Sequence, residues 1–392
     1  MKVLMISDVY FPRVNGVSTS IQTFRRELSG LGHQVDLVAP AYPAKQDDDP
    51  GIHRIASRQV PFDPEDRMMR AADLRAMLPR LRREQYDLVH IQTPFVAHYA
   101  GIDVAEALGV PRVESYHTFF EEYLFHYVPL LPKEFLRGLS RRFSRTQCNR
   151  MDALVVPSIA MRDKLGEYGV DVPMHVIPTG IPVASFSGGE RVRFRRKHGI
   201  PEDRPTLLFV GRVAHEKNIE FLLHAVRLAV AEHPELLFVI AGEGPALESL
   251  KRLGEKLELA PNLLFVGYLD RATELLDCYR AADAFIFASR TETQGLVLLE
   301  AMALGVPVIS TAVMGTRDVV GPKRGALVPE DDVGDFAANI VALIGDHALR
   351  ARLAAEGQAY VKEWHADALA RRLAAAWQEV IDNRAGTTKL AA

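Results

Sequence analysis

The sequence predicts an α/β protein made of two Rossmann-like domains, each with a doubly wound parallel sheet. Short runs rich in leucine and β-branched residues alternate with helical patterns, which is typical of βαβ units whose sheet is covered on both faces. The same alternation starts again after residue 200. Residues 177–205, rich in proline, glycine and charge, separate the two series and are predicted to form the linker and the entry to the second domain.

The expected strands are apolar runs of a length that suits a buried parallel sheet, each bounded by polar residues, glycine or proline. In the first domain they are KVLMIS (2–7), QVDLVAP (34–40), DLVHIQ (87–92), RVESYH (112–117) and ALVVPS (153–158). In the second domain they are TLLFVGR (206–212), LLFVIAGEG (236–244), LLFVGYL (263–269), AFIFASR (284–290) and PVIST (307–311). Helical patterns lie between them, among them residues 16–32, 219–234 and 274–283.

The two halves share a short phrase, AEALGVPRVESYH at 105–117 and EAMALGVPVISTA at 300–312. In each phrase a helix is expected to end near a glycine, Gly109 or Gly305, and a proline two residues later leads into a strand. Any helix-to-strand turn can have this form, so the phrase is explained either by common turn chemistry or by two domains of similar construction.

Composition restricts the class of protein. The chain has 392 residues, of which 48% are hydrophobic, so it can bury two cores of ordinary size. Its net charge of −3 gives no basic field for nucleic acid. Cys148 and Cys278 lie far apart and are expected to be buried, neutral thiols, which fits a reducing cytoplasm.

The apolar start of the chain is too short for a signal peptide and reaches Asp8 at once, which favours a first strand. No uninterrupted apolar stretch has the roughly 18 residues of a membrane span. Any membrane contact is therefore expected to be peripheral. Residues 386–392 are expected to be a disordered tail or a cloning scar.

Ligands of doubly wound sheets bind at the carboxyl ends of the strands, so the residues that follow each strand are the candidates for a site. After the first strand, Asn15, Gly16 and Val17 precede or open a helix, whose free N–H groups suit a phosphate. A plain strand-to-helix turn is the alternative. After the first strand of the second domain, Gly211 and Arg212 are followed by Lys217.

The cations Arg212 and Lys217 can converge on one anion, with arginine as a planar fork and lysine as a point charge. The alternative is that Glu216 and Glu220 pair with them on a solvated face. Further along, Gly242 and Gly244 form a G-x-G pattern between a strand and a helix. This pattern indicates either a backbone wall beside a nucleobase or a tight turn.

Two glutamates bracket the start of an apolar helix in SRTETQGLVLLEAMALG (289–305). Glu292 stands before the helix and Glu300 inside it, while Gly295 marks the junction where backbone N–H groups face outward. A carboxylate in the apolar run LVLLEAMAL needs a partner, and two hydroxyl donors of a sugar satisfy it well. We therefore expect Glu292 to bind a sugar, Glu300 a vicinal diol such as ribose, and a diphosphate to lie against the helix N-terminus. The alternative is that Glu300 is a helix-surface residue and Glu292 a helix cap.

In the first domain, His117 stands at the end of a strand, where it is either a hydrogen-bonding group for a substrate hydroxyl or a structural residue. The aromatic residues around and after it suit a core, or an apolar or sugar acceptor. They are Tyr116, Phe119, Phe120, Tyr123, Phe125 and Tyr127.

Residues 133–150 carry six basic residues and one acidic residue, with Phe135, Leu136, Leu139 and Phe143 interleaved. This pattern predicts a basic amphipathic helix at an anionic membrane surface, with a solvated cationic face as the alternative. The arginines that we expect to contact the membrane are Arg137, Arg141, Arg142 and Arg145.

No metal site is predicted. Asp47, Asp48 and Asp49 formally match an Asp-x-Asp pattern, but they lie in a polar loop flanked by proline rather than at a strand end. We interpret them as solvated loop charges.

With these motifs, the chain resembles the retaining family 4 glycosyltransferases of the GT-B fold over nearly all of residues 1–385. The resemblance rests on the E-x7-E pattern of Glu292 and Glu300, on G-R-x4-K at Gly211, Arg212 and Lys217, on the Gly16 loop and on His117. It implies two Rossmann-like domains that face a central cleft. Residues 1–182 would bind the acceptor, residues 183–368 the nucleotide sugar, and a helix at 369–385 would pack back on the first domain.

The resemblance also implies roles for individual residues. Arg212 and Lys217 would bind the diphosphate, Glu300 the ribose, Glu292 the donor sugar and His117 its 6-hydroxyl. Gln294, Gly295 and Leu296 would supply further donor contacts. The reaction would be a front-face transfer with retention, without a metal or another cofactor, in which the leaving phosphate helps to deprotonate the acceptor. Many members have phenylalanine in place of Gln294 and a second glycine in place of Asn15, and these departures leave the donor open.

Within the family, YHTFFEEY, TETQGLVLLEAMA and the basic helix look most like the diacylglycerol glucosyltransferases, which use UDP-glucose. The resemblance thus implies a cytoplasmic enzyme on the inner face of the membrane, with UDP-glucose, a lipid acceptor and an anionic membrane as partners. A transferase for lipopolysaccharide or another saccharide is an alternative. An epimerase acting on UDP-N-acetylglucosamine and a nucleotide-sugar sensor without turnover are alternatives of other classes.

Overall fold

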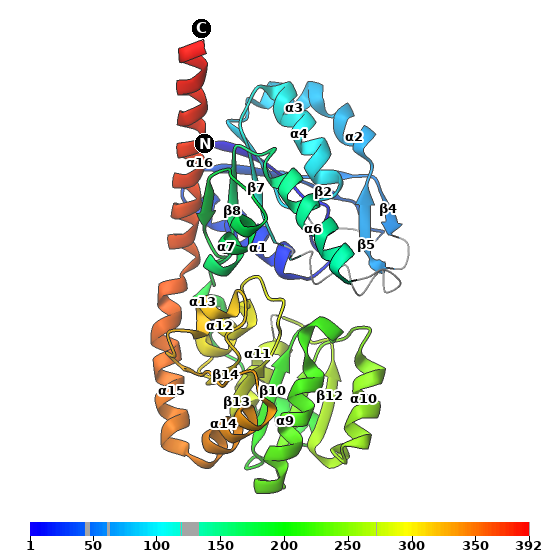
Figure 1. Cartoon of the computed structure of the whole chain (residues 1–392), viewed down its shortest axis with the longest axis vertical. Helices are drawn as coiled ribbons and strands as arrows, with labels where there is room; N and C mark the ends of the chain where they lie inside the picture. Colours follow the sequence, from blue (N-terminus) through cyan, green and yellow to red (C-terminus); the bar gives the residue numbers. More distant parts are fainter. Residues whose placement is uncertain (44–47, 61–62, 118, 120–132, 272, 392) are drawn as a thin grey trace. The chain divides into compact units, whose positions relative to one another are not determined.

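The computed structural model of the chain contains two units, each built around one parallel sheet (Figure 1). Unit 1 comprises Met1–Gly180 and Ala366–Ala392, and unit 2 comprises Ile181–His365. The residues that the structure describes are 1–43, 48–60, 63–117, 119, 133–271 and 273–391, without the side chains of 60, 63–66, 133 and 387–391. The predicted α/β class with two doubly wound sheets is confirmed.

The sheet of unit 1 has seven parallel strands in the order β3-β2-β1-β6-β7-β8-β9. Its five predicted strands are all present. The strands are β1 (Lys2–Ile6), β2 (Gln34–Pro40), β3 (Ile52–Ile55), β6 (Leu88–Ile91), β7 (Arg112–Ser115), β8 (Ala153–Val156) and β9 (Met174–Val176). The edge strands β3 and β9 were not predicted because they are only four and three residues long. The antiparallel hairpin of β4 (Ser57–Val60) and β5 (Asp63–Met69) was not predicted because few of its residues are apolar.

Helices cover the sheet of unit 1 (Figure 1). They are α1 (Gly16–Gly30), α2 (Ala71–Ala76), α3 (Leu78–Glu84), α4 (Val96–Leu108), α6 (Lys133–Cys148), α7 (Ile159–Glu167) and α16 (Ala366–Ala391). Trp377 of α16 is fully buried in the same hydrophobic cluster as Ile21 of α1. Arg372 of α16 donates to the carbonyl oxygen of Val176 at 2.7 Å. The helix therefore belongs to unit 1, and it extends to Ala391, whereas residues 386–392 were expected to be a disordered tail or a cloning scar.

The sheet of unit 2 has six parallel strands in the order β12-β11-β10-β13-β14-β15. The strands are β10 (Thr206–Val210), β11 (Leu237–Ala241), β12 (Leu263–Gly267), β13 (Ala284–Phe287), β14 (Val308–Ser310) and β15 (Ala326–Leu327). The helices of this unit are α8 (Arg191–His198), α9 (Ile219–Glu232), α10 (Leu247–Lys256), α11 (Glu274–Ala281), α12 (Leu296–Ala303), α13 (Thr316–Val320), α14 (Val333–Gly345) and α15 (His347–Tyr360).

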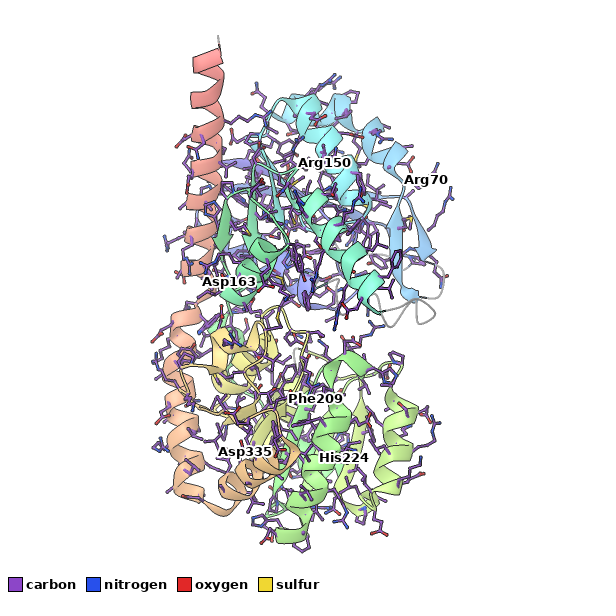
Figure 2. The ribbon with its side chains drawn as sticks, in the orientation of Figure 1. Arg70, Arg150, Asp163, Phe209, His224 and Asp335 are labelled. Atoms are coloured by element: carbon purple, nitrogen blue, oxygen red, sulfur yellow. The ribbon has the colours of Figure 1, made fainter. Side chains whose placement is uncertain are left out.

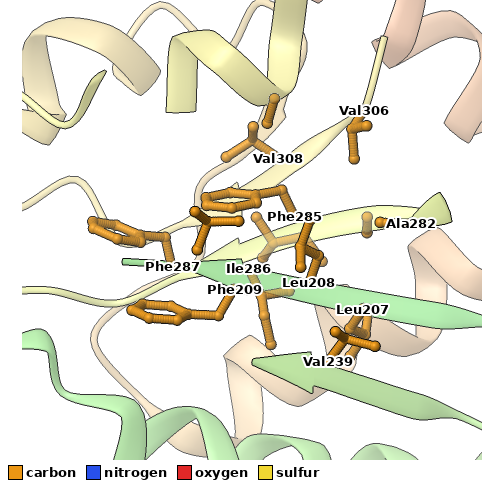
Figure 3. Packing of buried hydrophobic residues seen from close by; sticks show 14 of the residues in the cluster. Leu207, Leu208, Phe209, Val239, Ala282, Phe285, Ile286, Phe287, Val306 and Val308 are labelled. Carbon is orange, nitrogen blue, oxygen red and sulfur yellow. The ribbon is translucent and has the colours of Figure 1, made fainter. Parts of the chain in front are cut away.

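Buried aromatic rings stabilise the centre of unit 2 (Figures 2 and 3). Phe209 of β10 stacks on Phe287 of β13, with ring centroids 5.7 Å apart, and Phe285 lies 6.1 Å from Phe287. All three side chains are at most 1% exposed. Because β10 and β13 are neighbours in the sheet, this contact fixes the ends of the two strands that precede the candidate residues Arg212 and Glu292.

The sequence motif that the two halves share, at 105–117 and 300–312, occupies the same place in both sheets. Helix α4 connects β6 to β7, and α12 connects β13 to β14, each pair of strands being adjacent and parallel. Gly109 and Gly305, the glycines that follow these helices, have φ of +72° and +73°. The predicted helix ends are confirmed, and the matching strand orders favour two domains of similar construction.

The segment predicted as the linker and the entry to the second domain lies mostly within unit 2. Residues 191–198 form α8, which packs against α11 within unit 2. Phe194 of α8 is 3% exposed, and Arg193 forms an ion pair with Asp277 of α11. The contacts place the division between the units after Gly180 and after His365, close to the residues 182 and 368 expected from the sequence. Charge in this segment therefore stabilises a helix and does not indicate a linker.

Two aspartates of the polar loop form ion pairs that the sequence did not predict. Asp48 pairs with Arg54 at 2.7 Å, and Asp49 pairs with Arg25 at 2.9 Å. The interpretation as a solvated charge was wrong for Asp48, whose side chain is only 19% exposed, but Asp49 stays 55% exposed in its ion pair. Asp47 lies outside the described residues. Cys148 and Cys278 are buried and unpaired with each other, as expected.

Candidate active site

The order of the strands in unit 2 reverses between β10 and β13, which is where doubly wound sheets bind their ligands. Gly211, Arg212 and Lys217 follow β10, and Glu292, Gln294 and Gly295 follow β13. The structure therefore brings two of the predicted motifs to one edge of the sheet. Arg212 lies half-buried directly after Gly211, at the end of β10.

Lys217 and Glu292 form an ion pair across this edge, although 75 residues separate them. Lys217 ends the short 3-10 helix η2 (His215–Lys217), and the next residue, Asn218, donates to the carbonyl oxygen of Ala288 at 3.1 Å. That bond links the loop after β10 to the loop after β13. Both charged side chains are about one-fifth exposed, so the pair is accessible to a polar ligand.

A backbone hydrogen bond from a glycine that sequence analysis missed stabilises the loop that carries Glu292. The backbone N–H of Gly315 donates to the carbonyl oxygen of Glu292 at 2.9 Å. A Cβ at position 315 would lie 2.0 Å from the carbonyl oxygen of Thr293. Gly315 follows β14, so its place after a strand was the available signal. Gly295, at the N-cap of α12, has a φ of +88°, and Leu296 is the first residue of that helix.

Glu300 lies inside α12 and is 3% exposed. The guanidinium of Arg271 donates to its Oε1 at 2.6 Å, and the hydroxyl of Tyr279 donates to its Oε2 at 2.9 Å. These two partners explain how a carboxylate is tolerated in an apolar helix. Sequence analysis missed both, because neither residue belongs to a recognisable motif.

Gly242 and Gly244 serve the packing of two loops. A Cβ at position 242 would lie 1.9 Å from the carbonyl oxygen of Gly211, and a Cβ at 244 would lie 2.4 Å from that of Val213. Both glycines also have positive φ, of +139° and +157°. The loop after β10 thus fills the space in which a side chain at position 242 or 244 would lie. This packing supports a tight turn, and not a backbone surface beside a nucleobase, as the reason for the two glycines.

We expect Gly242→Ala to lower the free energy of unfolding of unit 2 by roughly 3 kcal/mol, because a methyl group would collide with backbone in an unfavourable conformation. Urea unfolding followed by circular dichroism measures the change. Gly166→Ala is the control, since a Cβ there meets no atom within 4 Å and the residue is inside α7. A Gly242 variant as stable as this control would show that the two loops can separate without cost.

In unit 1 the strand order reverses between β1 and β6, and Asp8 and Thr93, which follow these strands, bond to each other at 2.8 Å. Asp8 also accepts from the backbone N–H of Ala97 at 3.0 Å, at the start of α4. Burial raises the pKa of Asp8 to about 6. This carboxyl group caps a helix, and sequence analysis did not assign it.

Asn15, Gly16 and Val17 lie at the start of α1. The side-chain oxygen of Asn15 caps that helix by accepting from the backbone N–H of Ser18 at 2.8 Å. Gly16 is exposed, and a Cβ on it would meet no atom within 4 Å. Packing within unit 1 therefore does not require glycine here, which leaves room for a ligand at the helix N-terminus.

His117 follows β7, and its Nε2 is 3.2 Å from Oε1 of Gln92, which follows β6. Burial lowers the pKa of His117 to about 4, so the imidazole is neutral near pH 7 and can act as a hydrogen-bonding group. His117 lines a small cavity together with Ser20, Ser115 and Thr179. Gln92 is a contact of His117 that sequence analysis did not find.

The aromatic residues near His117 give no acceptor surface among the described residues. Tyr116 is 6% exposed, with its hydroxyl 2.8 Å from that of Ser144 in α6, and Phe119 is 8% exposed. Both are core residues, which corrects their assignment to the acceptor. Phe120 and Tyr123 lie outside the described residues.

Helix α6 buries small polar side chains and leaves large apolar side chains exposed. Its buried side has small polar residues, Ser140 and Ser144, beside Leu136, while Phe135 and Leu139 are 59% and 50% exposed. The exposed basic residues of this helix are Arg141, Arg142 and Arg145. Arg137 pairs with Glu134 at 2.6 Å, and Arg141 lies over the ring of Tyr168 at 5.6 Å.

Among the described residues, no group of three histidine, cysteine or acidic side chains could hold a metal ion. Within the same part of the chain, no helix is long and apolar enough to cross a membrane.

The chain matches two family models, which together cover most of it: Glycosyltransferase Family 4 over residues 14–185 and Glycosyl transferases group 1 over residues 190–360. It is 36% identical to the alpha-monoglucosyldiacylglycerol synthase of Streptococcus pneumoniae over 320 residues, which is 79% of this chain and 71% of that protein. It is 29% identical to a GDP-mannose-dependent alpha-mannosyltransferase of Mycobacterium tuberculosis over 382 residues, 92% of this chain and 93% of that protein.

Among solved structures, the sucrose-phosphate synthase of Thermosynechococcus elongatus superposes with a TM-score of 0.78 at 20% identity, over 97% of this chain and 99% of that one. This likeness supports the GT-B fold, in which units 1 and 2 are the two Rossmann-like domains. The family models and the relatives agree with the resemblance that the sequence suggested. The chain belongs to the group 1, family 4 glycosyltransferases of the GT-B fold.

Proposed function

We propose that this glycosyltransferase is a retaining, metal-independent enzyme that transfers glucose from UDP-glucose to a membrane lipid such as 1,2-diacylglycerol and forms an α-glycoside. The observation that carries the proposal is the pairing of Lys217 with Glu292 where the strand order of unit 2 reverses. A cation for a diphosphate and a carboxylate for a sugar are thereby side by side. The similarity to a glucosyldiacylglycerol synthase supports glucose and a lipid.

In the proposed reaction, the bond between the anomeric carbon and the phosphate oxygen breaks while the acceptor oxygen bonds to the same face of the carbon. The acceptor proton passes to the leaving phosphate oxygen. Arg212 and Lys217 stabilise the negative charge that develops on the diphosphate. Lys217 then exchanges its carboxylate partner for a phosphate, and Glu292 is released to accept hydrogen bonds from the sugar hydroxyls.

Further contacts of the donor belong to the proposal as well. Neutral His117 would bond to a hydroxyl of the sugar, and Glu300 to the ribose. The N–H groups at the start of α12, from Gly295 and Leu296 onward, would face the diphosphate.

The proposed membrane surface is the outer face of α6, where Phe135 and Leu139 lie exposed beside arginines. Large apolar side chains that insert into a headgroup region, together with cations that attract anionic lipids, are what peripheral binding requires. This surface would hold the enzyme on the inner face of the cell membrane, next to its lipid acceptor.

The first experiment offers UDP-glucose and, in parallel, GDP-mannose to the enzyme with vesicles that contain diacylglycerol, and analyses the lipids by mass spectrometry. A hexosylated diacylglycerol formed from UDP-glucose supports the proposal. Transfer of mannose from GDP-mannose, the donor named for the mannosyltransferase relative, would mean that GDP-mannose and not UDP-glucose is the donor. Nucleotide release at the same rate with and without lipid would indicate a saccharide acceptor. Exchange of the C2 proton of UDP-N-acetylglucosamine would indicate an epimerase. Donor binding without turnover would indicate a sensor.

The charge of α6 gives a separate prediction. Reversing Arg141 and Arg142 to glutamate should weaken binding to anionic vesicles by roughly tenfold or more, because each basic residue near such a surface contributes about 1 kcal/mol. Vesicle sedimentation at low and high salt measures the effect. Arg352→Glu with Arg371→Glu changes the net charge equally at two residues that are 62% and 64% exposed. Equal weakening in both double variants would refute a specific role for α6.

A further inference from the structure

Glu300 is bonded in a way that leaves its carboxylate ready for two more donors. Arg271 donates to Oε1 at 2.6 Å, and Tyr279 donates to Oε2 at 2.9 Å. An ionised carboxylate accepts about four hydrogen bonds, two at each oxygen. One acceptor position therefore remains on each oxygen of Glu300 beyond these two bonds. Two neighbouring hydroxyl groups, such as those of a ribose, match this pair of positions.

The two partners of Glu300 differ in their freedom to move. Tyr279 is fully buried on α11, where its ring lies 5.8 Å from that of Phe285 in β13. Arg193 anchors the same helix through its ion pair with Asp277. Arg271, by contrast, has 35% of its side chain exposed and stands in the segment between β12 and α11. Tyr279 is thus the rigid partner and Arg271 the adjustable one.

The hydroxyl of Tyr279 is also a dependable donor. Burial, followed by the charge of Glu300, raises the pKa of Tyr279 well above its usual value, so the phenol keeps its proton. The charge of Glu300 likewise raises the pKa of the Arg271 guanidinium. Both donors therefore remain protonated throughout the range in which enzymes of this kind are assayed.

We propose that Tyr279 is a positioning residue that fixes the carboxylate of Glu300 for recognition of the ribose hydroxyls of the donor nucleotide. The inference rests on the proposed function, in which Glu300 binds the ribose. Tyr279 does not touch the nucleotide, and it acts by directing Oε2 of Glu300 and keeping its second acceptor position in place.

Loss of the phenol hydroxyl would have a definite consequence. An arginine fork binds a carboxylate through two parallel N–H···O bonds when both oxygens are available. Without Tyr279, the carboxylate of Glu300 could turn so that Arg271 takes both oxygens. Each oxygen would still have one acceptor position, but the turned carboxylate would no longer direct the position on Oε2 toward the ribose.

The test compares the dissociation constants of UDP and 2′-deoxy-UDP by calorimetry, with GDP and 2′-deoxy-GDP in parallel, for the wild type and for Tyr279→Phe. The wild type should prefer the ribonucleotide by roughly tenfold or more, because a hydrogen bond to a charged group has about that effect. Tyr279→Phe should reduce this preference to about threefold or less, since only the hydroxyl is lost.

Tyr360→Phe is the matched control. Tyr360 is 4% exposed in the same unit, and its hydroxyl donates to the carbonyl oxygen of Asp318 at 3.3 Å. Both variants keep their ring and lose one buried hydroxyl, so both should keep the fold and show similar melting temperatures. Only Tyr279→Phe should change the ratio of the two dissociation constants.

The outcomes separate this inference from the proposed function. If the wild type and Tyr279→Phe discriminate equally while Glu300→Gln does not, Glu300 binds ribose without the help of Tyr279, and the inference is overturned while the proposed function stands. If Tyr360→Phe also loses the preference for the ribonucleotide, the effect comes from a general loss of rigidity in unit 2. That outcome also overturns the inference. If the wild type itself ignores the 2′-hydroxyl, the ribose role of Glu300 falls, and the inference falls with it, whatever the transfer assay shows.

Discussion

Glu292→Gln should lower the rate constant of hexose transfer by roughly a hundred- to a thousandfold, about 3 to 4 kcal/mol of transition-state stabilisation. The substitution keeps the size of the side chain and removes the charge that we propose to act on the donor sugar. Binding of the free nucleoside diphosphate should be unchanged or tighter, because Lys217 loses its carboxylate partner and becomes available to phosphate. Initial rates with saturating donor measure the first quantity, and calorimetry with UDP and GDP measures the second.

The control for this variant is Glu363→Gln, which removes an exposed carboxylate that pairs with Arg324 in the same unit. It should transfer hexose at the rate of the wild type. Turnover by Glu292→Gln within about threefold of that rate would exclude the sugar-binding role. A variant that loses nucleotide binding and turnover together would show that Glu292 orders the loop and does not act on the sugar.

Arg195→Ala should be among the most destabilising substitutions in unit 2, at roughly 3 to 5 kcal/mol of unfolding free energy. Its side chain is fully buried, and its guanidinium donates to the carbonyl oxygens of Ala281, Pro201 and Arg204 at 2.7, 2.6 and 2.9 Å. Truncation would leave these acceptors without a donor in a site that water cannot easily reach. Urea unfolding monitored by circular dichroism and by tryptophan fluorescence measures the change.

Arg196, the next residue on α8, supplies the comparison because it is exposed. Its replacement by alanine should change the unfolding free energy by no more than about 0.5 kcal/mol. Similar stabilities of the two variants would mean that the network around Arg195 can be replaced by water.

The edge of the sheet that carries the site could be predicted from chain direction. Parallel strands place their carboxyl ends on one edge, so Arg212 after β10 and Glu292 after β13 were expected there. The pairing of β10 with β13, which the structure shows, makes them neighbours. The apolar runs identified those strands by length and composition. The edge strands β3 and β9 were not predicted because a run of three or four residues is too short to show such a pattern.

The aromatic residues show the limit of this reasoning. Tyr116 and Phe119 follow a strand exactly as a ligand-binding residue would, yet they are buried, and the hydroxyl of Tyr116 meets Ser144. Whether a side chain after a strand faces inward or outward depends on the helix that packs there. Helix α6 covers Tyr116 with Ser140 and Ser144 on its inner side and leaves Phe135 and Leu139 exposed.

The sequence by itself determined the fold class, the two series of strands, the strand ends that carry the candidate site and the family. These follow from periodicity and from the polarity of residues near one another in the chain. Only the tertiary structure decided which partners satisfy Glu300, why Gly242 must be a glycine and which side of α6 is exposed. The physical reason is that a buried charge or a missing Cβ is explained by atoms of distant segments, and packing alone brings those segments together.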